Sequence, residues 1–300
     1  MKNFGKYLLA DNLRAAVAAL ACALLACILP TGFIAVVMLG LVTLQKGYKS
    51  GLMVLAFVLL PVIAFLVTHH IDFFYRFGLL LIQCGFVFIF ALILRYTGSW
   101  QWVVKSAAML GILVVGTVHI IFPDIKQTWA QLITHYLKTN DWTSTFRLGA
   151  GRSAEFVHHL APIATGGVVF FVLFGMIVLL ILARWWQSSL FSPGRLQMEF
   201  TSIRINPLAA GLLLLVASTG LIWQPAWLID VYPVLLLPFM LAGLSILHRL
   251  LMNRKDMVLL VLAVYVALLL LTFFTVIMLA IIGLIDSFYN FRKRYPLLQS

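Results

Sequence analysis

Long runs of apolar residues constrain this chain more than any other feature. The stretch VVFFVLFGMIVLLILA, residues 168–183, contains no charged side chain, and a helix needs about 20 such residues to cross a bilayer. Across the chain 63% of residues are hydrophobic and 10% are charged, whereas soluble domains have about 25% charged residues. The runs do not alternate as barrel strands do. We therefore predict an all-α fold, a polytopic transmembrane helical bundle.

The hydrophobic pattern divides the chain into about nine predicted membrane segments. We expect a six-segment bundle over 1–183, a basic loop over 184–206 and a three-helix region over 207–300. The predicted segments are 15–29, 32–44, 51–68, 74–95, 102–122, 163–183, 207–223, 229–250 and 257–285. The run 257–285 has no Gly or Pro between Met257 and Ile282, and backbone in lipid cannot turn without losing hydrogen bonds. It is therefore predicted to be one tilted helix, about 43 Å long.

The distribution of Lys and Arg predicts which side each loop occupies. With a cytoplasmic N-terminus, the N-terminal arm and the inner loops carry thirteen basic residues, and the outer loops carry five. This is the bias of an inner-membrane protein. Arg292, Lys293 and Arg294 fall outside if 257–285 crosses once; two crossings would give sixteen inside against five. The sequence leaves the side of the C-terminus open.

Charge and cysteine content exclude other classes of protein. The net charge of +12 comes from basic residues scattered in short loops, so we expect no nucleic-acid partner and take the lipid bilayer as the main environment. Cys22, Cys27 and Cys84 lie in apolar runs and are expected to be buried hydrophobes. The stretch LLAC at residues 24–27 is similar to a lipoprotein cleavage box, but a first membrane helix is the preferred interpretation because the chain stays apolar afterwards.

The second half of the chain resembles a family of membrane proteins. The loop residues Ser192-Pro193-Gly194, Glu199-Phe200 and Ile203-Arg204-Ile205 are followed by MLAGLSILHRLLMNRK and IIGLIDSFYNFRKR, and preceded by HHLAPIATGGVVFFVLFGMIVLLILARWW. Over roughly residues 155 to 294 this order resembles the YybS-like family of bacterial multipass membrane proteins. That family has no established activity, so the resemblance implies a bacterial inner-membrane location and little more.

The first six segments are similar, at the level of fold, to substrate-binding subunits of energy-coupling-factor vitamin transporters. The stretch QKGYKSG at 45–51 resembles a Gly-x-x-x-Gly turn of that superfamily. In those proteins a small-residue ridge on the first helix contacts the coupling subunit. Ala15, Ala19 and Ala23 form such a ridge here, as do Ala18, Cys22 and Ala26, because i, i+4 residues share a face. Packing within the same chain is the alternative.

Few polar residues are candidates for a site. Gln83 and His119 lie within or at the ends of predicted membrane segments, where polar groups are functional candidates. His69, His70 and Asp72 carry metal-ligand chemistry but match no metal motif. Asp286 is expected to pair with an arginine or to cap a helix. Arg184, Arg195 and Arg204 are candidates for contact with a partner protein or anionic lipid.

The stretch FSPGRLQMEFTSIRINP, residues 191–207, is predicted to be an ordered cytoplasmic turn. Pro193-Gly194 suits a tight turn, and Met198, Phe200, Ile203 and Ile205 are expected to hold the segment at the membrane interface. Glu199 is predicted to pair with Arg184, Arg195 or Arg204. An exposed pair of this kind contributes about 0–1 kcal/mol, so replacing Glu199 alone is expected to have little effect.

The sequence predicts binding or assembly more than catalysis. No Gly-x-Ser-x-Gly, His-Glu-x-x-His or phosphate-loop motif is present. We expect no cofactor, and a membrane enzyme of unspecified reaction ranks third among the functions considered. The preferred function is a small-molecule binding or transport subunit that lacks its own energy source. Its ligand would enter from the outer side, near 69–76 and 123–162. The alternative is a membrane scaffold or assembly factor for envelope complexes.

Overall fold

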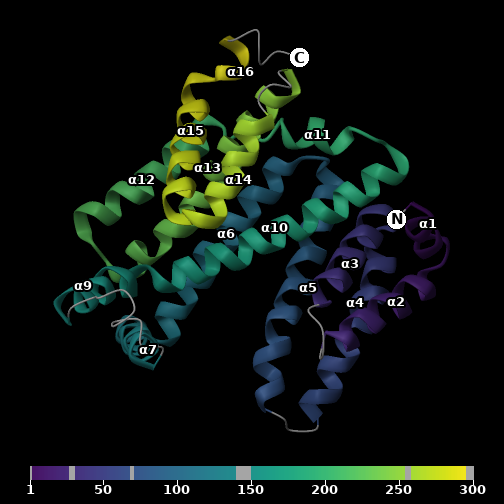
Figure 1. Cartoon of the computed structure of the whole chain (residues 1–300), viewed down its shortest axis with the longest axis horizontal. Coiled ribbons are helices and arrows are strands. Elements are labelled where there is room, and N and C mark those ends of the chain that lie inside the picture. Colours follow the sequence, from purple (N-terminus) through teal and green to yellow (C-terminus); the bar gives the residue numbers. More distant parts are fainter. Residues whose placement is uncertain (1, 27–30, 68–70, 140–149, 254–257, 295–300) are drawn as a thin grey trace. The chain divides into compact units, whose positions relative to one another are not determined.

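The computed structural model describes residues 2–26, 31–67, 71–139, 150–253 and 258–294. Every regular element in these ranges is a helix, as the sequence predicts. The chain forms two compact units, and Figure 1 labels the helices of both. Unit 1 comprises 1–103 and 172–202, and unit 2 comprises 104–171 and 203–300. The boundaries at 103 and 172 fall within long helices, whereas the sequence predicts a boundary after residue 183.

Unit 1 is built from the N-terminal helices and the middle of the chain. Two helices, α6 and α10, run through both units. The helices of unit 1 are α1 (Lys2–Ala10), α2 (Asn12–Leu25), α3 (Gly32–Lys46), α4 (Tyr48–Val67), α5 (Ile71–Thr97) and α11 (Arg195–Phe200), with the first residues of α6 (Trp100–Ile121) and most of α10 (Ala164–Phe191). Unit 2 contains α7 (Ile125–Thr139), α9 (Ala150–Leu160), the short 3₁₀ helix η1 (Ala161–Ile163), α12 (Pro207–Trp223), α13 (Ala226–Asn253), α14 (Val258–Leu270), α15 (Thr272–Tyr289) and α16 (Phe291–Arg294).

Five described helical stretches are long and apolar enough to cross a membrane. They are Leu80–Thr97, Trp100–Ile121, Ser153–Phe191, Ala226–Arg249 and Thr272–Tyr289. A sixth is added if α1 and α2, bent by 117° at their junction, count as one span. Four shorter apolar helical stretches have 10–17 residues each: Gly32–Lys46, Tyr48–Pro61 within α4, Pro207–Gly220 within α12, and Val258–Leu270. In the described residues the predicted segments are helical, but nine spans are not confirmed, because only five described helices are both long and apolar enough to cross.

Small residues allow the helices of unit 1 to pack closely. Ala15, Ala19 and Ala23 are buried on α2, which packs against α3 and α4. On α3, a Cβ added at Gly40 would lie 2.8 Å from the Cβ of Ala183, so this glycine lets α10 approach. The predicted Ala15–Ala23 ridge therefore lies inside the chain, and packing within the same chain accounts for it.

In unit 2, α13 and α15 contact each other through glycine. A Cβ added at Gly243 would collide with the carbonyl group of Leu279, and one added at Gly283 would collide with that of Phe239. The two backbones are thus in direct contact, an arrangement that small residues permit between membrane helices.

The prediction of one helix over 257–285 is wrong. The chain breaks at Leu271, whose φ and ψ are −124° and 44°, and it reverses direction there. Tyr265 of α14 lies 3.2 Å from His248 near the end of α13, whereas Thr272 lines a cavity with Pro233, roughly 22 Å back along α13. Thus α14 runs down α13 and α15 returns along it.

Threonine hydroxyls make this break compatible with an apolar environment. The Thr272 hydroxyl donates to the carbonyl of Leu268 at 2.7 Å, replacing the backbone N–H that would bond there in a continuous helix. The backbone N–H of Leu271 still donates to Ala267 at 2.7 Å. From the sequence, a turn here is expected to leave backbone groups without hydrogen bonds. The Thr272 hydroxyl supplies one of these bonds, which that expectation did not consider.

Candidate functional site

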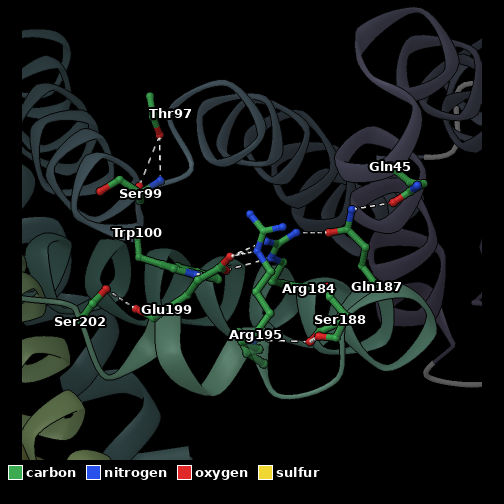
Figure 2. Close-up of polar contacts among 12 residues, drawn as sticks. Gln45, Thr97, Ser99, Trp100, Arg184, Gln187, Ser188, Arg195, Glu199 and Ser202 are labelled. Carbon is green, nitrogen blue, oxygen red and sulfur yellow. Dashed lines mark hydrogen bonds and ion pairs between the residues drawn. The ribbon is translucent and has the colours of Figure 1, made fainter. Parts of the chain in front are cut away.

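The loop after α10 is an ordered turn that positions a carboxylate. Gly194 has φ 87°, a left-handed conformation that glycine adopts without strain, and α11 starts at the next residue. Glu199 of α11 faces back toward α10, as Figure 2 shows. Its neighbour Phe200 is buried, whereas Met198 is 61% exposed. The predicted ordered turn is confirmed as a structure.

Four hydrogen bonds converge on the Glu199 carboxylate. Arg184 donates to both oxygens, at 2.9 Å from Nε to Oε2 and through Nη2 to Oε1. Arg195 donates to Oε1 at 2.8 Å, and the indole Nε1 of Trp100 donates to Oε2 at 3.3 Å. Two of the three arginines predicted as partners thus bind Glu199 (Figure 2).

Partial burial makes this cluster more costly to break than an exposed ion pair. The side chains of Arg184 and Glu199 are only 11% and 13% exposed, whereas Arg195 is 55% exposed. Burial by itself raises the pKa of Glu199, but the hydrogen bonds and charge of Arg184, with bonds from Arg195 and Trp100, lower that pKa overall. The expectation that Glu199 contributes little rested on exposure, which the structure does not show.

The Glu199 cluster extends to α3 through amides. Arg184 also donates to Gln187, whose side chain donates to Gln45 at 2.8 Å. These partners use both oxygens of Glu199 and tie α3, α6, α10 and α11 together within unit 1. We interpret this cluster as a structural clamp.

A second carboxylate, this one fully buried, lies in unit 2. Asp286 is fully buried, and its Oδ2 lies 3.3 Å from Arg292 and 3.8 Å from Arg204. Arg292 also donates to the hydroxyl of Ser245 at 3.1 Å and to the carbonyl of Ile203. Burial lowers the pKa of Arg292, and the charge of Asp286 opposes that shift. The predicted pairing of Asp286 with arginine is confirmed.

This Asp286 cluster brings three parts of unit 2 to the same end of the bundle. Arg204 precedes α12, Ser245 lies toward the end of α13, and Arg292 follows α15. The C-terminal basic residues therefore lie at the same end of unit 2 as Arg204 and Arg249. Both the reversal at Leu271 and this cluster favour the arrangement in which 257–285 contributes two segments.

A third ionisable pair joins α6 to α13. Nε2 of His119 lies 3.0 Å from Oδ2 of Asp230, and the other oxygen of Asp230 accepts from the backbone N–H of Gly166 at 2.7 Å. Asp230 is 2% exposed and His119 is 13% exposed. Because Gly166 is in the first turn of α10, where backbone N–H groups lack partners in the helix, the carboxylate caps that helix from another part of the chain.

The first turn of α10 also contacts α7. The indole Nε1 of Trp129 donates to the hydroxyl of Thr165 at 2.9 Å, and Thr165 is buried. Adjacent residues of α10 therefore bind two different elements: Thr165 binds α7, and Gly166 binds Asp230. A Cβ at Gly166 would collide with the carbonyl of Asp230, so α10 and α13 touch directly here.

An apolar cavity of about 420 Å³ opens beside this turn. Its lining includes Trp129 of α7, Ala164 and Gly167 of α10, Pro233 of α13 and Phe273 of α15. All its lining residues belong to unit 2, and they are almost entirely apolar. The volume falls within the roughly 300–1,000 Å³ of small-molecule sites, so the cavity can hold a small apolar molecule.

None of the other predicted site residues that the structure describes lines this cavity. Gln83 is half-buried in α5 of unit 1. His69 and His70 lie outside the described residues, as does the side chain of Asp72. In the described part of the chain, no three His, Cys, Asp or Glu side chains are grouped as metal ligands would be. Arg204 binds Asp286 instead of Glu199.

Sequence reasoning identified His119 but missed Asp230. The signal that could have identified Asp230 is its place in the apolar stretch WLIDVYPVLLLP. An ionised carboxylate in such a stretch is energetically unfavourable unless it has a partner. The partner itself was not predictable, because 111 residues separate Asp230 from His119.

Comparisons with protein families, curated proteins and solved structures found no match to this chain. The resemblances noted in the sequence therefore remain predictions.

Proposed function

We propose that this chain is an integral membrane protein that binds a small apolar molecule in the cavity of unit 2. The observation that carries the proposal is the cavity itself, an open apolar pocket lined by residues of α7, α10, α13 and α15. Helices α13 and α15 contain two of the five candidate spans, so the ligand that such a site meets most often is lipid hydrocarbon. An apolar lining favours a chain-like or other nonpolar ligand over a polar vitamin.

The proposed role is that of a binding or transport subunit in the bacterial inner membrane, with its N-terminus in the cytoplasm. The sequence has no phosphate-loop motif, so energy-driven transport would use a separate coupling subunit. The Ala15–Ala23 face is buried, so such a partner would contact another surface. Helix α7 belongs to the stretch 123–162, near which ligand entry was expected.

Photolabelling with a neutral diazirine-bearing fatty alcohol tests this proposal. The full chain is purified in nanodiscs and labelled, and the modified peptides are identified by mass spectrometry. We expect labelling of cavity residues such as Ile133 and Val168. Gly167→Leu should reduce it about tenfold, because Gly167 lines the cavity and its added Cβ meets no atom within 4 Å.

Gly211→Leu is the matched control, since Gly211 also has open space around its Cβ but does not line the cavity. It should label like the wild type. Equal labelling of the cavity in the wild type and in Gly167→Leu would contradict the proposal. In a separate measurement, mass spectrometry of molecules that copurify with the wild type identifies the class of the natural ligand.

The alternative function is a scaffold for envelope complexes. It is favoured by α11, where Met198 and Arg195 are exposed on a helix that the Glu199 cluster holds in place. A photocrosslinker at Gln197 tests it in cells. Recovery of one defined protein would support a scaffold, and recovery of lipid alone would exclude this version of it.

A further inference from the structure

We propose that the His119–Asp230 pair is a proton-binding site that controls access to the cavity. This inference rests on the proposed function, because it concerns regulation of the same cavity. It starts from the position of the pair. Asp230 is nearly fully buried, and it is hydrogen-bonded directly to Gly166 in the first turn of α10. Buried ionisable groups in membrane segments commonly mark proton or substrate pathways.

The geometry supplies a route for the proton. His119 is the more exposed partner, at 13% against 2% for Asp230, so the proposed route takes the proton to the imidazole first. With His119 protonated on Nε2, uptake at Nδ1 allows the Nε2 proton to pass to Oδ2 of Asp230. The imidazole ends neutral in its other tautomer, the carboxylate becomes a neutral acid, and one proton has been bound.

Protonation of Asp230 weakens its hold on α10. An ionised acceptor makes a hydrogen bond roughly twice as strong as a neutral one, and Oδ1 of Asp230 accepts the Gly166 N–H at 2.7 Å. The adjacent residues Ala164 and Gly167 line the cavity, and Thr165 holds Trp129 of α7 in its wall. Loosening this turn therefore affects α7 and the cavity wall together. Because the wall is then less firmly held, the protein with neutral Asp230 exchanges ligand faster.

No other described charge forms an ion pair with Asp230 or His119. The helices that meet at this pair carry few other basic residues in their described parts. These are Lys105 on α6, Arg184 on α10, eighteen residues after Gly166, and His248 and Arg249 toward the far end of α13. The described titratable residues of α7, α9 and the turn before α7 are Asp124, Lys126, His135, Lys138, Glu155, His158 and His159. Of these, Asp124 and Lys126 follow His119 most closely in the chain, and both are exposed.

The test measures the rate of cavity labelling by the same neutral fatty alcohol in a series of pH values. The wild type should label roughly fivefold faster at the acid end, reflecting the weaker bond to Gly166. Asp230→Asn, which mimics the neutral acid, should label fast at every pH. His119→Gln, which keeps the carboxylate but removes the relay, should label slowly with little dependence on pH.

Asp124→Asn is the control and should keep the wild-type profile. Size-exclusion chromatography and thermal unfolding verify that each variant is folded. If Asp230→Asn does not fold, the comparison of His119→Gln with the wild type still tests the inference. A wild-type rate that does not change with pH, or a wild-type profile in His119→Gln, would overturn the inference. Absence of cavity labelling in every protein would instead contradict the proposed function.

Discussion

Asp230 and His119 lie 3.0 Å apart although 111 residues separate them in the chain. They come from α13 and α6, and the backbone of α10 completes the contact through Gly166. This relationship makes one carboxylate the meeting point of three helices beside the apolar cavity. Two other carboxylates, Glu199 and Asp286, are likewise bound by side chains from distant segments.

Replacing Glu199 should destabilise the fold substantially. Glu199→Ala leaves the largely covered Arg184 without its carboxylate partner. Breaking a fully buried pair costs about 3–5 kcal/mol, which is the upper limit for this partly buried one. The measurement is thermal unfolding of the purified chain. Arg195→Gln is the control, because an exposed partner contributes at most about 1 kcal/mol. Equal effects of the two variants would show that burial does not strengthen the cluster.

The contribution of Glu199 should depend on pH. Its pKa in the folded chain is lowered, so it stabilises the fold above the unfolded pKa of about 4.3, and this stability is lost as the pH falls through the folded pKa. The unfolding midpoints of wild type and Glu199→Gln should therefore converge on acidification. A gap that stays constant down to strongly acidic pH would exclude ionised Glu199 as its source.

The contact of α13 with α15 should not tolerate a side chain at Gly283. Gly283→Ala drives a Cβ into the carbonyl of Phe239, and overpacking of this kind costs about 1–3 kcal/mol. Thermal unfolding provides the measurement. Gly211→Ala, also a helical glycine but with open space at its Cβ, should be neutral or slightly stabilising. Destabilisation by both variants would point to a general effect of the substitution.

The C-terminus should lie on the same side of the membrane as the loop 203–206. Arg204 bonds to the backbone of Asp286 and Ser287 at the end of α15, which fixes both at one end of unit 2. Topology reporters fused after residue 300 and inserted at residue 206 should therefore give the same readout, which we expect to be cytoplasmic. Opposite readouts would restore the single crossing of 257–285.

Orientation itself should depend on the basic residues of the 184–206 segment. Replacing Arg184, Arg195 and Arg204 together with Gln removes three of the thirteen basic residues placed inside, so a reporter at residue 197 should show mixed orientation. Because Arg184 and Arg204 also hold buried carboxylates, Arg195→Gln alone is compared with the triple variant. An external readout from the unaltered chain would invert the predicted orientation.

The sequence by itself determined the helical fold and the apolar character of its elements, because composition and run length depend only on local residues. It also predicted the turn at Pro193-Gly194 and the partners Arg184 and Arg195 of Glu199, which lie close in the chain. The tertiary structure decided the rest. The Ala15–Ala23 ridge is buried within unit 1, and Thr272 permits a reversal that an apolar run alone did not suggest. Asp230 meets His119, and an apolar cavity forms beside them, only because distant helices pack together; hydrophobic periodicity carries no information about which helices those are.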